Sequence, residues 1–172
     1  QYDKIVSIEM AEAIGFRYFD TYFGQLGRLL KPEGLAVLQY ITFPESRFEQ
    51  YLKNTDFSQI YIFPGSCLLS NHEVMKSLHR TSDLLLNDLE TMGQHYATTL
   101  RKWRLNIEKN RRELQQLGYD DKFLRKWIYY LCFCEAGFAE RAINDVQVVL
   151  GRANTKLLGD YNGQSEPYID NL

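Results

Sequence analysis

Two acidic side chains, Glu9 and Glu12, come directly after a β-branched, apolar segment at residues 2–8. If that segment is a strand, its carboxyl end is where open α/β sheets bind their ligands. A carboxylate in that place can hold a polar ligand or act as a base. The same side chains could instead favour the dipole of the helix that follows. The spacing alone leaves both interpretations open.

Two polar pairs are further candidates. Gln39 and Tyr40 lie near the end of a second apolar segment, residues 35–42, and His95 and Tyr96 open a predicted helix. A buried amide needs partners, so Gln39 either lines a pocket or is satisfied by a neighbouring backbone group. A His–Tyr pair can transfer protons or bind an anion, although a histidine at a helix start also serves in capping or packing.

The cysteines and histidines offer no comparable site. The chain has three cysteines, Cys67, Cys132 and Cys134. Because their number is odd and their surroundings are apolar, we do not expect a disulfide framework. The last two stand two residues apart on a predicted helix, which cannot easily present both to one metal ion. The three histidines have no ligand spacing, and there is neither a Gly-x-Ser-x-Gly elbow nor a Walker loop. The sequence therefore predicts no metal site.

The elements that position the candidates alternate between strand and helix. Residues 2–8 and 35–42 have the pattern of buried strands, and apolar residues recur at helical spacing over residues 16–30. The helix stops at residues 31–34, a cationic last turn followed by Pro and Gly. A strand, a helix and a strand with short joints predict a right-handed crossover and a parallel pair. The chain is therefore of the α/β class.

Further elements follow along the chain. The patterns predict a short helix or loop at 46–53, a rigid turn at 61–65, a helix capped by Asn71 and running to about 81, a strand at 84–89, a helical block at 96–117, a helix from Asp120 or Asp121 to about 138, and a strand at 145–150. Residues 153–172 read as a polar tail. Residues 9–15 do not form the Gly-rich turn that opens a doubly wound sheet, so the chain reads as starting within a fold.

Composition bounds the class of protein. The chain has 172 residues, 45% of them hydrophobic and 24% charged, as expected for one globular domain. Its 20 basic and 22 acidic side chains argue against a basic nucleic-acid footprint. No apolar run approaches the ~20 residues of a membrane span, and no signal peptide is evident. These features predict a soluble, cytoplasmic domain.

Six segments in order carry a family resemblance: residues 2–15, 30–35, 61–68, 95–103, 129–138 and 147–150. Over residues 2–152 the chain resembles the C-terminal half of the cyclopropane-fatty-acyl-phospholipid synthases, relatives of the mycolic acid cyclopropane synthases. The resemblance implies the C-terminal portion of a class I S-adenosylmethionine-dependent methyltransferase (Rossmann-like) fold. A helical lid insertion would lie at about residues 95–117.

The resemblance also implies an activity. Such enzymes use S-adenosylmethionine to add a methylene across a cis double bond of an unsaturated phospholipid acyl chain, forming a cyclopropane fatty acid. A bound bicarbonate is thought to remove the proton. By position, Glu12, Gln39, the backbone of Ile41 and Tyr96 would hold it. Gln39 stands where many members have His, so it can donate a hydrogen bond to an anion but cannot take a proton.

Binding residues carry over in the same way. Ser7, Ile8 and Glu9 would form one wall of the cofactor pocket, because the Gly-rich motif is not in this chain. Four aromatic side chains would line the acyl tunnel, with core packing as the alternative (Phe63, Tyr129, Tyr130 and Phe138). The resemblance implies peripheral contact with a membrane, and a homo-oligomer is possible, with two chains exchanging elements. Two rivals stay open: a related C-methyltransferase without ring closure, and a non-catalytic lipid-binding or interaction fragment.

Overall fold

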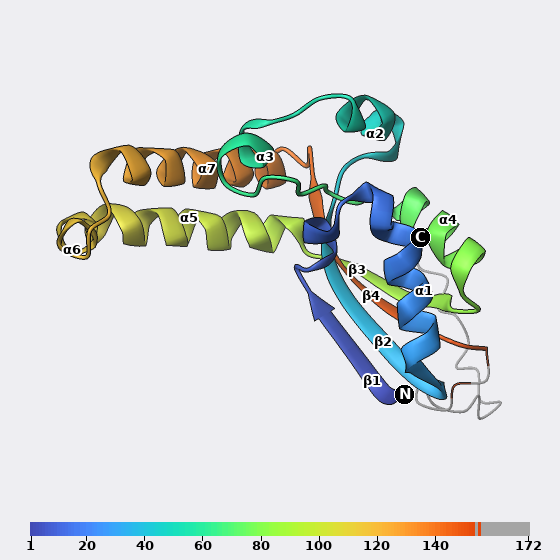
Figure 1. Cartoon of the computed structure of the whole chain (residues 1–172). Helices are drawn as coiled ribbons and strands as arrows, with labels where there is room; N and C mark the ends of the chain where they lie inside the picture. Colours follow the sequence, from blue (N-terminus) through green and yellow to red (C-terminus); the bar gives the residue numbers. More distant parts are fainter. Residues whose placement is uncertain (154, 156–172) are drawn as a thin grey trace, which may run out of the picture.

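A four-stranded mixed sheet forms the centre of the chain in the computed structural model, which describes residues 1–153 and 155 (Figure 1). The strands are β1 (Tyr2–Ile8), β2 (Leu30–Thr42), β3 (Leu85–Thr91) and β4 (Asn144–Gly151), in the spatial order β1-β2-β4-β3. The predicted parallel pairing of β1 with β2 is confirmed. β4 runs antiparallel to both of its neighbours. The start of β4 therefore lies beside the carboxyl ends of the other strands.

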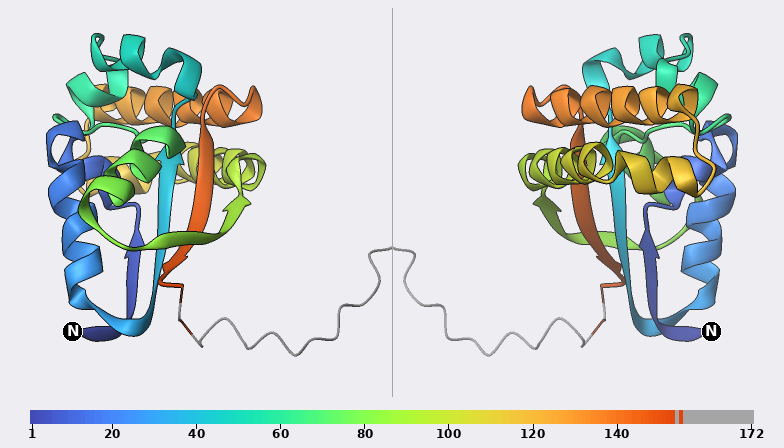
Figure 2. Two further views of the ribbon diagram at one scale, coloured as in Figure 1. Left: turned by 90° about the vertical axis from the view of Figure 1, so that its right-hand side faces the viewer. Right: turned by 90° about the vertical axis from the view of Figure 1, so that its left-hand side faces the viewer.

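One side of the sheet carries the main core. Two short 3-10 turns (Ala11–Ile14 and Phe16–Tyr18) lead into α1 (Phe19–Leu29), which packs with α4 (Asn71–Thr81) on the same side (Figures 1 and 2). Apolar side chains at helical spacing on α1 pack against apolar side chains at alternate positions of β2 and β4. Their burial in one cluster stabilises the packing of the helices on the sheet. The central members of this cluster are Phe23, Leu38, Tyr40, Val74 and Val148.

A helical hairpin projects from the end of the sheet at which β3 ends and β4 begins, in the direction away from α1 and α4 (Figures 1 and 2). It consists of α5 (Gly93–Lys109), α6 (Arg111–Gln116) and α7 (Asp121–Ala139), and α5 lies along α7. A small core of its own holds the two long helices together (Leu100, Leu131 and Phe138). Two short helices, α2 (Glu45–Leu52) and α3 (Phe57–Tyr61), complete the fold, and α3 contacts α7. No helix in the described part of the chain is long and apolar enough to cross a membrane.

Several predicted boundaries need correction. β2 begins at Leu30 rather than at residue 35, because Leu30 already pairs with Tyr2; residues 31–34 form an irregular stretch before Leu35 pairs with Lys4. The helical block predicted at 96–117 divides into two helices at Asn110. Ser70, not Asn71, caps α4, since its hydroxyl oxygen accepts a hydrogen bond from the Glu73 N–H (3.2 Å).

Other elements settle open questions. Asp120 caps α7, accepting from the Phe123 N–H at 2.7 Å. α3 was not predicted; a reciprocal capping box between Asp56 and Gln59 starts it. The three cysteines are free thiols. The predicted polar tail lies almost wholly outside the described residues.

Candidate functional site

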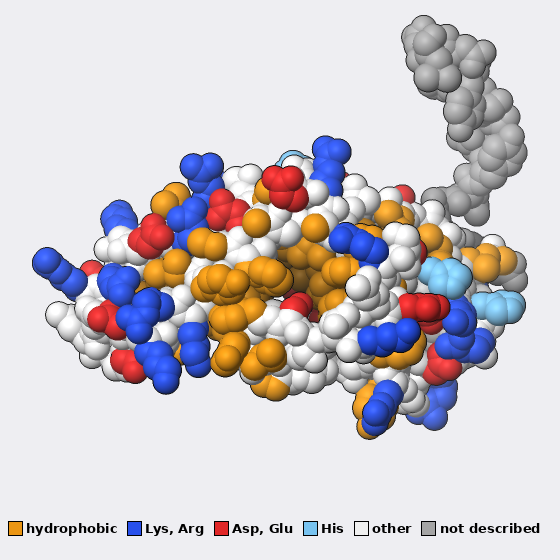
Figure 3. All heavy atoms as spheres, turned by 90° about the horizontal axis from the view of Figure 1, so that it is seen from above, with side chains coloured by type: hydrophobic (Ala, Val, Ile, Leu, Met, Phe, Trp, Pro, Cys, Tyr) orange, Lys and Arg blue, Asp and Glu red, His pale blue; other side chains and the backbone are white. Residues whose placement is uncertain are grey.

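Polar side chains from four elements meet at one end of the sheet. β1 and β2 end here, β4 begins here, and the first turn of α5 lies against the start of β4. Figure 3 shows a hollow on this face, between the hairpin and the part that carries α1 and α4, with hydrophobic side chains around it and acidic side chains inside. The expected position of a ligand at the carboxyl ends of parallel strands therefore coincides with a hollowed surface.

Gln39 joins two carboxylates at this end of the sheet. Its amide nitrogen donates hydrogen bonds to Asp145 Oδ2 at 2.9 Å and to Glu9 Oε1 at 3.3 Å. Asp145 is only 2% exposed, and its other carboxylate oxygen is buried without a partner in the described part of the chain. The predicted pocket-lining role of Gln39 thus takes the form of a bridge between two acids.

Glu12 adds a third carboxylate to this group. Its Oε1 accepts a hydrogen bond from the Ile41 N–H at 2.5 Å, while Oε2 is buried with no partner among the described residues. The Ile41 carbonyl oxygen in turn accepts from the Leu69 N–H at 3.1 Å. Glu12 is therefore fixed to β2 by one oxygen and has the second free.

The pKa values of all three acids are raised. Burial, followed by the negative charges of Glu12 and Asp145, raises the pKa of Glu9 to about 7. Burial also raises the pKa of Asp145 to about 6, against the lowering effect of the Gln39 hydrogen bond. The pKa of Glu12 is raised by burial as well. Near neutral pH the acid cluster (Glu9, Glu12 and Asp145) therefore holds a proton that it can exchange, and it favours a cationic ligand.

Tyr96 lies in the first turn of α5 and faces this acid cluster. Its ring packs against Phe138 (centroids 4.9 Å apart) and edge-on to Trp103 (6.1 Å). Burial, and then the charges of Glu9 and Asp145, raise the pKa of Tyr96. Its hydroxyl group therefore stays protonated and can donate a hydrogen bond.

The hydrogen-bond donors predicted to hold bicarbonate are largely used within the chain itself. Both N–H bonds of the Gln39 side chain are directed at carboxylates, and the Ile41 N–H is taken by Glu12. Of the four predicted contacts, only Tyr96 has a donor to offer. A further anion would also meet three acids, which repel it. The geometry instead suits a group that is positively charged or that donates hydrogen bonds.

The three residues predicted to form the cofactor wall, at the end of β1, lie in different environments. The Ser7 hydroxyl is buried and accepts a hydrogen bond from the Tyr22 hydroxyl at 2.6 Å. Ile8 is 50% exposed, and Glu9 adopts a left-handed backbone conformation (φ 51°). This turn of the chain, unusual outside glycine, directs Glu9 toward Gln39.

The four predicted acyl-chain residues divide into three groups. Phe63 and Tyr130 contact each other (centroids 5.7 Å apart). Phe138 is buried in the hairpin core beneath Tyr96. Tyr129 faces the other way, against Phe57 of α3 (4.5 Å). An apolar wall beside the acid cluster is thus provided by Phe63 and Tyr130.

Two sequence candidates do not belong to the site. Tyr40 is fully buried in the main core, and its hydroxyl donates to Asn71 Oδ1 at 3.1 Å. The His95 side chain is exposed, and no side-chain hydrogen bond caps the start of α5. Conversely, the sequence analysis missed Asp145. Its position at the polar start of the last strand was the available signal, but only the antiparallel pairing of β4 brings it opposite Gln39.

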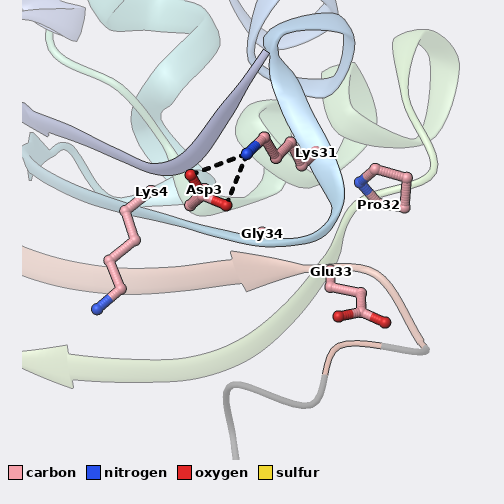
Figure 4. A pocket seen from close by; sticks show the side chains of 6 residues that line it. All are labelled: Asp3, Lys4, Lys31, Pro32, Glu33 and Gly34. Carbon is pink, nitrogen blue, oxygen red and sulfur yellow. Dashed lines mark hydrogen bonds and ion pairs between the residues drawn. The ribbon is translucent and has the colours of Figure 1, made fainter.

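A second hollow lies at the opposite end of the sheet (Figure 4). It has a volume of about 440 Å³ and is lined by residues 3–4 and 31–34. Lys31 Nζ forms an ion pair with Asp3 across it (2.9 and 3.0 Å). Its charged lining side chains are exposed, two of the four (Asp3 and Lys31) pair with each other, and it lies at the end of β1 opposite to the acid cluster. We therefore place the functional site at the acid cluster.

Comparison with known proteins shows the family and the fold of the chain. A family model described as mycolic acid cyclopropane synthetase matches residues 1–148. The chain belongs to this family. Its members' fold is also found here: a crystal structure of mycolic acid cyclopropane synthase CmaA1, complexed with SAH and CTAB, has a TM-score of 0.76 and 26% identity, covering 86% of this chain and 54% of that one. The predicted class I methyltransferase fold is thereby confirmed.

Two curated relatives of the chain carry different activities in their names. Tuberculostearic acid methyltransferase UfaA1 of Mycobacterium tuberculosis is 38% identical over 152 residues, which are 88% of this chain and 36% of that protein. The cyclopropane-fatty-acyl-phospholipid synthase of Escherichia coli is 34% identical over 157 residues, covering 88% of this chain and 38% of that protein. The chain thus spans little more than a third of the length of these relatives.

Proposed function

We propose that the whole protein to which this chain belongs is an S-adenosylmethionine-dependent lipid methyltransferase. Its substrate would be an unsaturated acyl chain of a phospholipid, and its product a cyclopropane fatty acid. The observation that carries the proposal is the acid cluster at the carboxyl ends of β1 and β2, tied by Gln39 and walled by Phe63 and Tyr130. The names of the two curated relatives support the same class of substrate.

The residues present fit the methyl donor. When bound, S-adenosylmethionine supplies an electrophilic methyl group on a positively charged sulfur. The free oxygens of Glu12 and Asp145 are buried and unpartnered within the described residues, which suits a cationic or hydrogen-bond-donating neighbour. Ile8, which is 50% exposed at the end of β1, and Glu9 beside it would form part of the wall around it.

The acid cluster also suits the charge that develops on the lipid. When a carbon–carbon double bond accepts a methyl group, one of its carbons becomes positively charged, and nearby fixed carboxylates stabilise that charge. The aromatic wall keeps water away from this carbon, so that it is not trapped as an alcohol. Ring closure requires loss of a proton from the added methyl group. We assign its acceptance to Glu9 and Asp145, while the electrons of the broken C–H bond form the new C–C bond.

A second candidate is methyl transfer without ring closure, which the name of the 38% identical relative favours. It shares the first step and differs only in which proton leaves the lipid. The acid cluster serves both outcomes, so the product decides between them.

The test is a product analysis. The whole protein is incubated with S-adenosylmethionine labelled in its methyl group and with vesicles of a monounsaturated phospholipid, and the fatty acids are analysed by mass spectrometry. We expect a labelled product heavier by one CH2 that resists mild hydrogenation, as a cyclopropane does. A labelled product that takes up hydrogen would favour the second candidate. Absence of label in the lipid would contradict both and support the non-catalytic rival.

A further inference from the structure

Positive charge is concentrated on the outer half of the hairpin. Residues 101–126 carry nine basic and four acidic side chains, whereas the remainder of the chain carries eleven basic and eighteen acidic ones. We call residues 101–126 the hairpin tip. An acidic protein thus carries a local excess of five positive charges at the end farthest from its sheet (Figure 1). Such segregation is a physical feature of surfaces that bind polyanions.

Most of these cations are not neutralised within the chain. Arg104 pairs with Glu108 and Glu135, and Arg111 pairs with Asp121. The other seven basic side chains of the hairpin tip make no ion pair in the part of the chain that the structure describes, and all but Lys126 are exposed (Arg101, Lys102, Lys109, Arg112, Lys122, Arg125 and Lys126). Their charge is therefore available to a partner.

Large apolar side chains share the hairpin tip with these cations. Leu117 is 75% exposed at the turn before α7, and Tyr119 and Phe123 are each more than 40% exposed. The rings of Tyr119 and Phe123 stack (centroids 5.0 Å apart), and Phe123 also stacks on Trp127 (5.9 Å). Exposed aromatic and aliphatic groups among lysines and arginines are the composition of segments that bind at a membrane interface.

A row of aromatic rings continues from the hairpin tip to the site. Trp127 packs on Tyr130 (5.5 Å), and Tyr130 contacts Phe63 of the apolar wall (5.7 Å). Figure 3 looks onto the face that contains the hollow, and the Lys and Arg side chains over the hairpin gather on this same face. A flat anionic surface lying against the hairpin tip would therefore also lie beside the mouth of the hollow.

We propose that the hairpin tip docks the protein on the surface of an anionic lipid bilayer, with Leu117 and Phe123 inserted among the headgroups. Charge complementarity selects an anionic surface, and the exposed apolar side chains favour a bilayer over an acidic protein, because only the bilayer offers hydrocarbon behind its negative charges. The delivery of acyl chains along the aromatic row rests on the proposed function. Docking itself can be measured without any turnover.

Vesicle sedimentation of this chain tests the proposal. The chain is mixed with phosphatidylcholine vesicles that contain or lack phosphatidylglycerol. We expect binding only to the anionic vesicles and loss of that binding at high salt, since exposed charges are screened. Reversing two cations of the hairpin tip, Arg112→Glu with Lys122→Glu, should weaken binding about tenfold or more. Leu117→Asn should weaken it several-fold at unchanged net charge.

A matched control reverses two exposed cations at the far end of the sheet, Lys4→Glu with Arg28→Glu, and changes the net charge by the same amount. It should bind as the unaltered chain does, with circular dichroism confirming the fold of each variant. Equal weakening in both double variants, or no binding to anionic vesicles, would overturn the proposal. So would binding of acidic acyl carrier protein in place of vesicles, which would make the hairpin tip a protein-binding surface. None of these results depends on whether the methyl transfer occurs.

Discussion

Gln39 has two N–H bonds on its side-chain amide, and in this structure both are used on acids that would otherwise repel each other. The hydrogen bonds to Glu9 and Asp145 hold two like charges at the end of the sheet, and burial raises the pKa of each acid. A histidine at this position could exchange a proton, whereas an amide can only position its partners. In the proposed reaction, the carboxyl groups and not Gln39 would therefore carry the proton.

This arrangement has a cost in stability that depends on pH. The pKa of Asp145 rises from 3.8 to about 6 in the folded chain, so the folded state binds more protons than the unfolded state between these values. The free energy of unfolding should consequently fall as the pH rises through this interval. Asp145→Asn removes this contribution and should make the chain more stable than the unaltered one above pH ~7, by on the order of 1–3 kcal/mol.

Urea unfolding followed by circular dichroism at a series of pH values measures this effect. Asp88→Asn, on the exposed strand β3, is the control and should leave the pH dependence as it is. An Asp145→Asn variant that loses stability as steeply as the unaltered chain over the same interval would show that the burial of Asp145 is not the cause.

Single residues could be predicted from the sequence where a strand end positions them. Glu12, Gln39 and Tyr96 were expected together, and Gln39 and Glu12 are indeed held at the end of β2 while Tyr96 faces them from α5. Their roles toward a bound anion were not predictable, because they depend on which donors the neighbouring acids use. Asp145 stands 106 positions from Gln39 in the chain, so no local pattern could join the two.

At the scale of elements, the joint between β4 and α5 determines where Tyr96 lies. The Met92 N–H donates to the Asp145 carbonyl oxygen at 2.7 Å, and the Gly93 N–H donates to Asn144 Oδ1 at 3.0 Å. A side chain at position 93 would clash with Asn144 and approach Phe138 to 3.3 Å. Glycine is required there because the helix begins in direct contact with the strand.

Gly93→Ala should therefore destabilise the chain by about 1–3 kcal/mol, because the start of α5 must move away from β4. Gly24→Ala in α1 is the control: its added methyl group would lie 3.4 Å from the nearest atom, Thr81 Cβ, and should change stability little or raise it slightly. Urea denaturation of the two variants gives the comparison. Equal stabilities would indicate that the joint yields without strain.

The elements themselves were largely predictable, because burial on one side of the sheet imposes period two on β2 and β4 and period 3.6 on α1. The errors occur where another contact overrides the local pattern. Pro32 and Gly34 correctly mark the end of α1 at Leu29, but residues 31–34 belong to β2 as an irregular stretch between the pairs Tyr2–Leu30 and Lys4–Leu35. The break at Asn110 within a continuous polar stretch has no strong signal, since neither Pro nor Gly marks it.

At the scale of the molecule, the antiparallel insertion of β4 between β2 and β3 creates the site. It places the start of the last strand against the ends of the first two and anchors the hairpin over them. Charge is distributed along the same axis, with acids at the sheet and cations at the hairpin tip. The excess of cations over residues 101–126 can be counted in the sequence, but its position at the far end of the molecule follows only from the folding of α5, α6 and α7 away from the sheet.

The central claim is that the acid cluster performs the chemistry, and the most direct measurement is the turnover of the whole protein carrying Asp145→Asn. Loss of a group that stabilises charge or accepts a proton typically lowers the rate by ~10² to 10³-fold. We expect Asp145→Asn to lose turnover by that factor while it keeps its fold, and Asp88→Asn to have normal turnover. The activity of the unaltered protein should rise as the pH increases through about 6 to 7, because the acids lose their proton over this interval. Asp145→Asn with the turnover and pH profile of the unaltered protein would contradict the account.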